Sequence, residues 1–431
     1  MSPKKKIVIL GAGFGGVRAA TDICRNLAKL NLNGKYEVVL VDRNHYHTYV
    51  PILYEVATTS KDVANQIKLK DIVTFHLKDI FQNHCVTIKE ATVSEIDLIE
   101  GDVHFQDAEK LKFDYLVLAL GSETNYFDIP GLKENSYGLK TFGDAIRVRD
   151  AVWDLVDSRA SNEEIKIIVG GGGATGVETA GEIKAWICEL DEKFKKCPAS
   201  VKIIEAMPTV LAGLDQKVVK RVLKRLKAIN VELVLNEAIE KVEPKKVFLK
   251  SGTMIPFDVL VWTGGAKASS LMTGLPLKKE KRGRVEVPGV MQCLPQTEDL
   301  KFYGKIYGLG DAICFTNAKT GRPIPQVAEA AIEQAKVVAH NIIEDIKEAE
   351  GLKPKSQPIH YIPREYPYII TAGGKYAVAK MGPIVIGGFF GWILKGLVEL
   401  YYLLFNVLPP FQAIRIWLKG LWIFIKNDRL G

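Results

Sequence analysis

The sequence of 431 residues has few cysteines, and their spacing excludes several kinds of site. None of the six cysteines forms a CxxC pair, so neither a zinc ribbon nor a thioredoxin-like redox motif is present. We expect them to be mainly reduced, core-type residues of a protein that faces the cytosol. They are Cys24, Cys85, Cys188, Cys197, Cys293 and Cys314.

The chain also lacks the marks of secretion, nucleic-acid binding and disorder. Only a short apolar run follows the first lysines before a glycine-rich turn, so we expect no signal peptide. The net charge of +8 comes from scattered basic residues with few interleaved aromatics. This pattern argues against nucleic acid and fits a solvated surface or attraction to anionic lipid. Apolar residues make up 47% of the chain, which is ample for the cores of two or three domains.

A glycine-rich turn follows the first apolar run, residues 7–10, which is typical of a central parallel strand. Gly11, Gly13 and Gly16 then satisfy the pattern GxGxxG. In this motif the first glycine permits a tight turn, the second lets the backbone approach a pyrophosphate, and the third lets the helix pack against the strand. The next strand ends in Asp42, whose carboxylate can accept both hydroxyls of an adenosine ribose.

A second turn of the same kind follows the apolar residues 165–169. Gly171, Gly173 and Gly176 fill the glycine positions, and the next strand ends in Glu205. A carboxylate there binds the 2′-hydroxyl of NADH and repels the 2′-phosphate of NADPH. Two complete units imply two dinucleotides. Because two nicotinamides could not usefully exchange hydride, we predict a flavoprotein that takes hydride from NADH.

Four further segments resemble motifs of the two-dinucleotide-fold flavoprotein oxidoreductases, and the resemblance spans residues 5 to about 345. Residues 113–122 resemble the turn where the chain leaves the FAD domain, and residues 258–265 resemble its counterpart in the NAD domain. Residues 307–311 resemble the late FAD motif, in which an aspartate binds the ribityl chain. Residues 86–97 resemble the small sheet whose backbone reaches the adenine.

Within that superfamily the chain most resembles the type II NADH:quinone oxidoreductases, which are single-chain, membrane-associated FAD enzymes of respiratory chains that do not pump protons. Residues 41–54, 175–178 and 205–211 carry this resemblance. It implies an α/β fold with two Rossmann-like domains, the second inserted in the first, and a C-terminal amphipathic helical region that anchors the protein to a membrane. The implied FAD domain is 1–130 with 285–350, the NADH domain is 131–284, and the membrane region is 351–431.

The resemblance also implies the residues that hold each nucleotide. Those implied for FAD are Gly11, Gly13, Phe14, Gly15, Gly16, Asp42, Arg43, Thr48, Val93, Ala119, Gly121, Gly310, Asp311 and Ala328. Those implied for NADH are Gly171, Gly173, Ala174, Thr175, Gly176, Glu178, Glu205, Thr263, Gly264 and Gly265. Hydride would pass from the nicotinamide to the flavin, and electrons would then reduce a lipid-soluble quinone. No protein nucleophile and no metal is expected.

One motif departs from the family. The family has AQxAxQQ beside the flavin where the quinone head docks, whereas residues 328–334 here read AEAAIEQ, with glutamates at Glu329 and Glu333. An amide can donate a hydrogen bond to a quinone carbonyl and an ionised carboxylate cannot, although a desolvated glutamic acid can stay protonated or relay a proton. The predicted catalytic residues are Glu178, Glu329 and Glu333, with quinone approaching near Tyr49 and Pro51.

The last part of the chain differs in character from the rest. Pro409 and Pro410 separate two helix candidates, of which the second carries an apolar stripe with basic residues on another face, as in a helix lying in a membrane interface. The stripe is Ile414, Trp417, Leu418, Leu421, Trp422 and Ile425. The first candidate, 389–408, is long enough to span a bilayer, but Lys395 and Glu399 make a span costly unless they pair along one polar edge.

We therefore favour an interfacial, monotopic helix pair on the cytoplasmic face of a membrane over a true span. A homodimer surface or a core-capping helix pair remains an alternative for the same stripe. Two other functions remain open, and a third is disfavoured. A sulfide:quinone oxidoreductase needs cysteines facing the flavin, and Cys314 lies near Asp311 in sequence. A soluble disulfide reductase needs a CxxxxC pair, which is missing. A flavoprotein of the apoptosis-inducing-factor type would bind partners or sense NADH.

Overall fold

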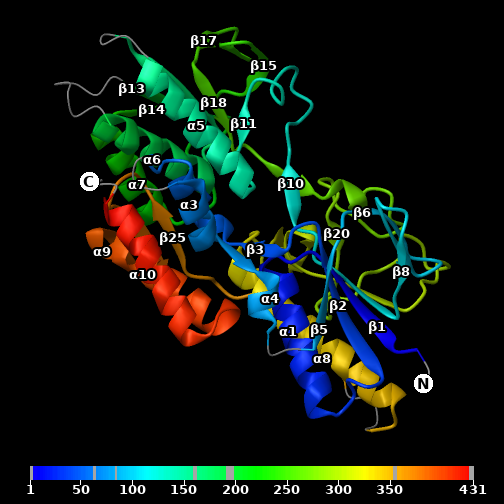
Figure 1. The fold of residues 1–431 in the computed structure, drawn as a ribbon. Coiled ribbons are helices and arrows are strands. Elements are labelled where there is room, and N and C mark those ends of the chain that lie inside the picture. The colour runs from blue at the N-terminus through cyan, green and yellow to red at the C-terminus, as the bar shows by residue number, and fades with distance from the viewer. Residues whose placement is uncertain are drawn as a thin grey trace. The chain divides into compact units, whose positions relative to one another are not determined.

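The computed structural model describes residues 3–61, 65–82, 85–158, 163–190, 199–352 and 357–426 (Figure 1). The chain divides into two units, each assembled from three separate segments. The first unit consists of Met1–His47, Phe75–Glu123 and Ala266–Tyr366, and the second consists of Thr48–Thr74, Thr124–Gly265 and Pro367–Gly431.

These units differ from the domain boundaries inferred from the sequence. Residues 266–284 group with the first unit, whereas the sequence assigned them to the NADH domain. Residues 367–431 group with the second unit, whereas the sequence treated 351–431 as a separate region. The two glycine turns nevertheless fall in different units, one in each.

The first unit is built on a five-stranded parallel sheet in the order β21-β9-β1-β2-β5. Its strands are β1 (Lys5–Leu10), β2 (Tyr36–Asp42), β5 (Val86–Glu90), β9 (Tyr115–Leu118) and β21 (Lys305–Gly308). The apolar residues of β1 are fully buried, as expected for a central strand. Helix α1 (Phe14–Lys29) follows the first glycine turn, and α8 (Ala328–Ala349) packs beside it (Figure 1).

Smaller elements complete the first unit. The strands β6 (Val93–Asp97), β7 (Asp102–Phe105) and β8 (Lys110–Lys112) form an antiparallel sheet. The others are α4 (Leu77–Ile80), β19 (Ala266–Ala268), η2 (Ser270–Met272), β20 (Val285–Glu286), η3 (Gly310–Ala312), β22 (Ile313–Cys314), β23 (Thr316–Asn317) and β24 (Arg322–Pro323). Three short strands span the points where the chain passes between units, namely β3 (Tyr46–Thr48), β4 (Thr74–His76) and β10 (Ser122–Thr124).

The second unit repeats the plan with a parallel sheet in the order β11-β18-β12-β13-β14. Its strands are β11 (Tyr137–Gly138), β12 (Ile165–Gly170), β13 (Ala199–Glu205), β14 (Val231–Leu235) and β18 (Val259–Trp262). Its helices before the tail are α2 (Leu53–Val56), α3 (Gln66–Val73), α5 (Phe142–Ser158), α6 (Ala174–Leu190) and α7 (Gln216–Ala228), with η1 (Val50–Ile52). An antiparallel sheet of β15 (Ile239–Glu243), β16 (Lys246–Leu249) and β17 (Met254–Pro256) adds a second apolar core.

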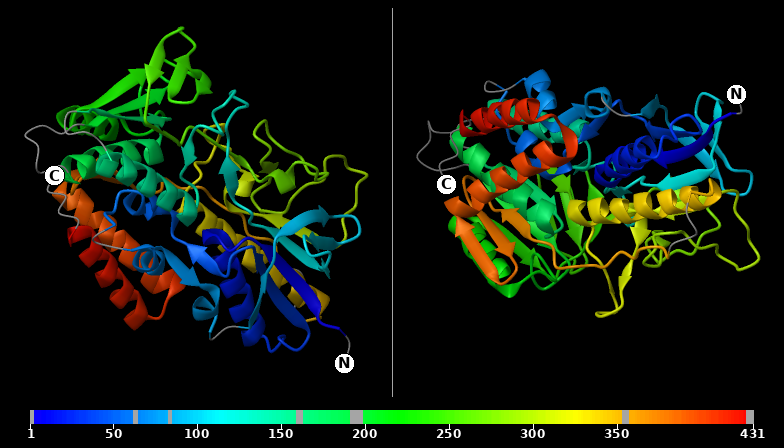
Figure 2. Two further views of the ribbon diagram at one scale, coloured as in Figure 1. Left: turned by 45° about the horizontal axis from the view of Figure 1, so that its top comes forward. Right: turned by 90° about the horizontal axis from the view of Figure 1, so that it is seen from below.

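The C-terminal part of the second unit begins with a three-stranded antiparallel sheet, β25 (Tyr368–Thr371), β26 (Ala377–Met381) and β27 (Ile384–Gly388). Helix α9 (Phe389–Tyr402) follows directly, continues through the π-helical η4 (Leu403–Val407), and is separated by prolines from α10 (Pro410–Lys426). The two helices, orange and red, lie side by side in both views of Figure 2. The predicted break at Pro409 and Pro410 is confirmed.

Candidate functional site

The first glycine turn has the geometry that its sequence predicts. Gly11 has φ of 106°, and a Cβ there would lie 2.4 Å from the Ala119 carbonyl oxygen. A Cβ at Gly16 would lie 1.9 Å from the Gly11 carbonyl oxygen, so the helix can approach the strand only with glycine at this position. At Gly13, in contrast, a Cβ would meet no heavy atom within 4 Å, which leaves space beside the turn for a ligand.

Both peptide groups on either side of Ala12 are fixed in this turn. The Ala12 N–H donates to Asp42 Oδ2 at 2.8 Å, and His47 Nδ1 lies 2.8 Å from the Ala12 carbonyl oxygen. Because a carbonyl only accepts, Nδ1 is the donor. His47 is fully buried, its ring meets Phe14 edge-on at 5.1 Å, and burial lowers its pKa to about 4 despite the hydrogen bond to Ala12. The imidazole is therefore neutral near pH 7.

The rest of the first unit covers one side of this turn. A Cβ at Gly15 would lie 2.3 Å from Leu309 Cδ1 and 3.1 Å from the carbonyl oxygen of Ala331 on α8. Gln334, also on α8, accepts the Gly310 N–H at 2.8 Å. The hydroxyl of Ser122 donates to Asp311 Oδ2 at 2.8 Å. The late FAD-type motif and the first turn are thus packed against the same helix.

The second turn repeats the geometry of the first. Gly171 has φ of 103°, and a Cβ there would lie 2.5 Å from Gly264 Cα. A Cβ at Gly176 would lie 1.9 Å from the Gly171 carbonyl oxygen and 2.8 Å from Thr263 Oγ1. A Cβ at Gly173 would again meet no heavy atom within 4 Å. The same three glycine positions therefore have the same three functions in both units.

In the second turn the two peptide groups on either side of Gly172 are also held, but one of the holding groups differs in kind. The Gly172 N–H donates to Glu205 Oε2 at 2.5 Å, and the Leu211 backbone N–H donates to the Gly172 carbonyl at 2.7 Å. Thr175, which stands where the first turn has Gly15, is exposed to solvent. Nothing comparable to α8 forces a glycine at that position of the second turn.

Each turn therefore fits a dinucleotide by its own geometry. The open space at the second glycine lies beside a helix N-terminus, whose unpaired N–H groups favour phosphate. Several other residues predicted for FAD lie outside the first glycine turn. Arg43 is exposed, Val93 begins β6, Ala328 begins α8, and Gly121 has φ of 68° with no heavy atom within 4 Å of an added Cβ. Thr48 belongs to the second unit.

Two residues predicted for NADH have other close neighbours within the second unit. A Cβ at Gly265 would lie 2.7 Å from the ring of Phe127. Glu178, on α6 after the second turn, accepts the Thr371 N–H at 3.3 Å. Burial raises the Glu178 pKa to about 8, although that hydrogen bond and the charge of Lys395 lower it. Glu178 therefore holds a proton near neutral pH.

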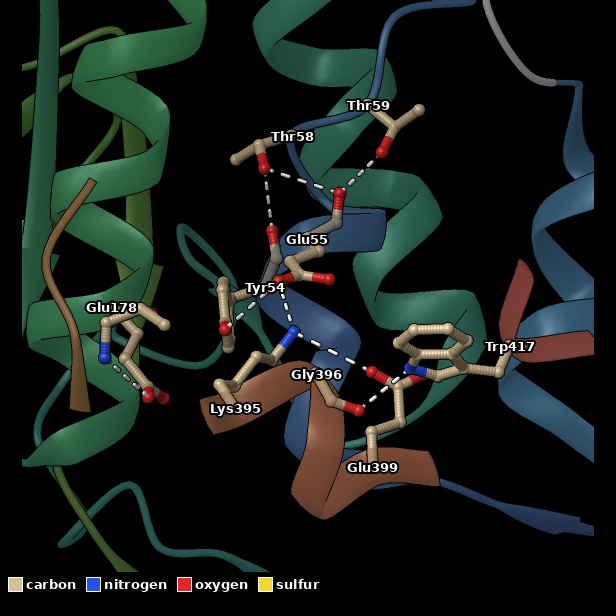
Figure 3. Close-up of polar contacts among 10 residues, drawn as sticks. Tyr54, Glu55, Thr58, Thr59, Glu178, Lys395, Gly396, Glu399 and Trp417 are labelled. Carbon is tan, nitrogen blue, oxygen red and sulfur yellow. Dashed lines mark hydrogen bonds and ion pairs between the residues drawn. The ribbon is translucent and has the colours of Figure 1, made fainter. Parts of the chain in front are cut away.

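A cluster of charged side chains, drawn with Glu178 in Figure 3, lies to one side of it. Lys395 on α9 is hydrogen-bonded to Glu55 Oε1 and lies 4.0 Å from Glu399. Burial lowers the Lys395 pKa, but the two carboxylates outweigh it, so the pKa is raised and the lysine is charged. Burial raises the Glu399 pKa to about 7. Glu55 Oε2 has no hydrogen-bond partner among the described residues.

The tail helices therefore have an unusual distribution of polarity. Lys395 and Glu399 pair along one edge of α9, as predicted, and this edge faces the interior of the second unit rather than solvent. The outer face of α9 is apolar instead, with Phe389, Phe390, Ile393, Leu397, Val398 and Tyr401 exposed. On α10 the predicted stripe exposes Ile414, Leu418, Trp422 and Ile425. Residues 389–407 are long and apolar enough to cross a membrane, with 28% of the apolar window buried.

The two glutamates that replace family glutamines lie on α8 of the first unit. Glu329 is exposed in its first turn. Glu333 pairs with Lys336 at 2.6 Å and with Arg364 at 2.9 Å. Burial raises the Glu333 pKa, but these cations outweigh it and the pKa is lowered. The possibility that Glu333 stays protonated is therefore wrong for this environment.

The cysteines also differ from expectation. Cys24 and Cys85 form a disulfide, and Cys188 is also disulfide-bonded, so the expectation of reduced thiols was wrong for these three cysteines. Cys293 and Cys314 are free and buried, and burial raises the pKa of both thiols. Cys197 lies outside the described residues.

Sequence reasoning missed three residues of these sites. His47 lies outside the glycine motifs identified in the sequence, although it fixes the first turn. Gln334 belongs to the quoted motif, but its role at Gly310 needs the packing of α8. Glu55 gave no signal, because its partner Lys395 lies 340 positions away.

Comparisons with known proteins agree with this geometry. The type II NADH:quinone oxidoreductase Ndh of Mycobacterium tuberculosis (strain ATCC 25618 / H37Rv) is 27% identical over 424 residues, which cover 93% of this chain and 85% of the relative. The type II NADH:quinone oxidoreductase of Staphylococcus saprophyticus is 28% identical over 349 residues, 79% of this chain and 82% of the relative. These relatives confirm the resemblance that the motifs indicated.

Solved structures match the fold over nearly the whole chain. NDH2 from Plasmodium falciparum in complex with NADH has a TM-score of 0.80 at 17% identity and covers 100% of this chain and 99% of its own. The sulfide:quinone oxidoreductase of Aquifex aeolicus has a TM-score of 0.73 at 20% identity, with 93% and 90% covered. The predicted α/β class with Rossmann-like domains is confirmed. Residues 5–335 match the pyridine nucleotide-disulphide oxidoreductases, and the chain belongs to that family.

Proposed function

We propose that this chain is a membrane-associated type II NADH:quinone oxidoreductase, which uses FAD to pass electrons from NADH to a lipid-soluble quinone without pumping protons. The observation that carries the proposal is the pair of glycine turns. Both fit a dinucleotide, but one is covered by α8 and the other is open to solvent. A covered site suits a resident cofactor, and an open site suits a substrate that must leave after each turnover.

FAD belongs to the first turn. Gly13 leaves room for the pyrophosphate, and Asp42 lies at the end of β2, where an adenosine ribose is bound in this fold. Asp311 follows the Gly310 turn that Gln334 holds, which suits its expected contact with the ribityl chain. FAD supplies the redox chemistry when bound, because it accepts a hydride and releases electrons singly or in pairs.

NADH belongs to the second turn. Glu205 already accepts the N–H groups of Gly172 and Met207, so its side chain is oriented at the end of β13. A carboxylate in this position accepts the 2′-hydroxyl of NADH and repels the 2′-phosphate of NADPH. Thr263, Gly264 and Gly265 follow the neighbouring strand β18 and form the other side of the turn.

Glu178 is the proton-holding group of the second unit. Its carboxyl is buried, lies on the helix that begins at the NADH turn, and has a pKa of about 8. Such a group holds a proton at neutral pH and exchanges it readily, which suits the transfer of two electrons and two protons to a quinone. Its role is to bind and release that proton rather than to attack the substrate.

The two glutamates of the quinone motif have different roles. Glu333 is ionised and tied to Arg364, so it positions the segment after α8 and donates no hydrogen bond to a quinone. Glu329 is exposed at the start of α8 and is the residue of the pair that is available to relay a proton. In this proposal, the two glutamates take these roles in place of the two glutamines whose amides donate hydrogen bonds in the family motif.

The membrane surface is the outer face of α9 and α10. Apolar side chains cover this face, while the charges of α9 point inward to Glu55. An interfacial helix pair buries such a face without moving Lys395 into hydrocarbon, so a monotopic arrangement on the cytoplasmic side is favoured over a span. If a second copy of the chain covers the same face instead, the protein will be a homodimer that does not pellet with vesicles.

The main alternative is a sulfide:quinone oxidoreductase, since a structure of that class shares the fold. Such chemistry needs reactive thiolates. The free thiols Cys293 and Cys314 are buried with raised pKa values, which disfavours it. The apoptosis-inducing-factor type would bind NADH and reduce its flavin, but it would not turn over with quinone.

Anaerobic flavin spectroscopy on the detergent-purified protein tests the proposal. NADH should bleach the visible flavin band, and a short-chain quinone should restore it rapidly. Bleaching without recovery by any quinone would refute the quinone role and favour a sensor. Bleaching by sulfide but not by NADH would refute the assignment of the second turn.

A further inference from the structure

His47 holds one peptide of the first glycine turn in a way that the second turn reproduces with another donor. In the first turn, His47 Nδ1 donates to the Ala12 carbonyl at 2.8 Å. In the second, the Leu211 backbone N–H donates to the equivalent Gly172 carbonyl at 2.7 Å. The two turns diverge in sequence at this point, yet each has a donor at the same carbonyl.

The held carbonyl determines where the next N–H points. A trans peptide is planar, with its C=O and N–H on opposite sides. The Ala12 carbonyl points to His47, so the Gly13 N–H points away from it. Gly13 is exposed, with no heavy atom within 4 Å of an added Cβ, so a phosphate has room beside this peptide.

The opposite side of the same residue is also fixed, because the Ala12 N–H donates to Asp42 Oδ2 at 2.8 Å. Both peptides around Ala12 are therefore oriented before a ligand arrives. A preorganised donor costs less ordering free energy on binding than one that must rotate into place.

The surroundings of His47 preserve its donor. Its ring is fully buried, edge-on to Phe14 at 5.1 Å and stacked with Phe75 at 6.4 Å. These contacts fix the ring plane, and the carbonyl partner fixes the tautomer with a proton on Nδ1. His45, two residues earlier on the chain, is exposed and pairs instead with Glu90 at 3.3 Å.

We propose that His47 is a positioning residue for flavin binding, which orients the Gly13 N–H towards the FAD pyrophosphate through the Ala12 carbonyl. The inference rests on the proposed assignment of FAD to the first turn. His47 lies outside the glycine motif, and we expect it to affect the binding of FAD but not the binding of NADH.

The test compares two variants that separate hydrogen bonding from packing. His47→Phe keeps a ring but removes the donor, whereas His47→Asn keeps a donor near the Nδ1 position but loses ring volume. FAD release from the full-length holoprotein is measured by flavin fluorescence on dilution. We expect His47→Phe to raise the FAD Kd about tenfold, equal to about 1.4 kcal/mol, and His47→Asn to raise it less.

Controls make each outcome decisive. His45→Phe should leave the FAD Kd within about twofold of wild type, and NADH binding should be unchanged in both His47 variants, since Leu211 holds the other turn. An unchanged FAD Kd in His47→Phe overturns the inference. A higher FAD Kd in His47→Asn than in His47→Phe overturns it as well. If the wild-type protein itself binds no FAD, the proposed function fails instead.

Discussion

The two glycine turns of this chain have the same backbone but different surroundings. In both, the first glycine has φ above 100°, the third lies against the carbonyl of the first, and the second faces open space. In the first turn Gly15 is enclosed by Leu309 and α8, whereas the equivalent Thr175 of the second turn is exposed. The common part suits binding of a pyrophosphate, and we expect the different part to affect how easily the ligand leaves.

Under the proposed function, the glycine motif and the retention of the bound nucleotide are separate properties. The GxGxxG pattern provides a tight turn and a helix N-terminus, which any dinucleotide can use. We expect retention to depend on residues far away in sequence, such as those of α8, which among the described residues enclose Gly15 of the first turn. A chain that must keep one nucleotide and exchange another can therefore use the same motif twice.

The largest predicted effect tests what the turns share. Gly16→Ala and Gly176→Ala each place a Cβ about 1.9 Å from a backbone carbonyl. Each should lower the free energy of unfolding by about 3 kcal/mol or more, because the backbone must move. Gly13→Ala and Gly173→Ala are the matched controls, since their Cβ atoms meet no atom. Thermal and urea unfolding measure the four variants, and an equal loss in the controls would contradict the comparison.

The second prediction is that one buried group in each unit makes stability depend on pH in opposite directions. The His47 pKa falls from 6.5 to about 4 on folding, so its contribution is present above pH 6.5 and is lost as pH falls towards 4. The Glu178 pKa rises from 4.5 to about 8, so its contribution is present below pH 4.5 and is lost as pH rises towards 8. At about 1.4 kcal/mol per pKa unit, the contribution of His47 is about 3 kcal/mol and that of Glu178 is somewhat larger.

Unfolding free energies measured from pH 4 to 8 check this prediction. His47→Phe should flatten the acid side of the stability profile, and Glu178→Gln should flatten the side between pH 5 and 8. If both variants retain the wild-type profile, the buried groups do not titrate as described.

The third prediction exchanges the residue that differs between the turns. Gly15→Thr forces a side chain against Leu309 and Ala331, where a Cβ alone would already lie 2.3 Å from Leu309 Cδ1. We expect a loss of about 2 kcal/mol and faster flavin release. Thr175→Gly, the reverse exchange, should cost less than about 1 kcal/mol because the site is exposed. Equal effects of the two exchanges would refute the claim that α8 encloses only one turn.

The smallest predicted effect concerns choice of nucleotide. Glu205→Gln keeps the side-chain length but removes the charge that repels a 2′-phosphate. The preference for NADH over NADPH, measured as a ratio of kcat/KM values, should fall about tenfold, or about 1.4 kcal/mol. Asp42→Asn is the control in the first turn and should leave this ratio unchanged. An unchanged ratio in Glu205→Gln would mean that another group distinguishes the 2′-hydroxyl of NADH from the 2′-phosphate of NADPH.

The glycines and terminal acids were predictable from sequence because their contacts are local to one strand–turn–helix unit. The role of His47 was not, since it reaches back 35 positions to a carbonyl that any residue type could supply. The charges of α9 were predicted to pair with each other, which they do at 4.0 Å. The sequence did not predict that these two side chains face inward, because this depends on Glu55, which lies in a distant segment of the chain.

The measurement that tests the central claim most directly is nucleotide retention by the purified protein. The protein is saturated with FAD and NAD⁺, passed through a desalting column, and both nucleotides are measured in the protein fraction. The account predicts that about one FAD per chain stays with the protein while NAD⁺ is lost. Loss of FAD as complete as that of NAD⁺, or retention of two flavins per chain, would contradict the division between a covered and an open turn.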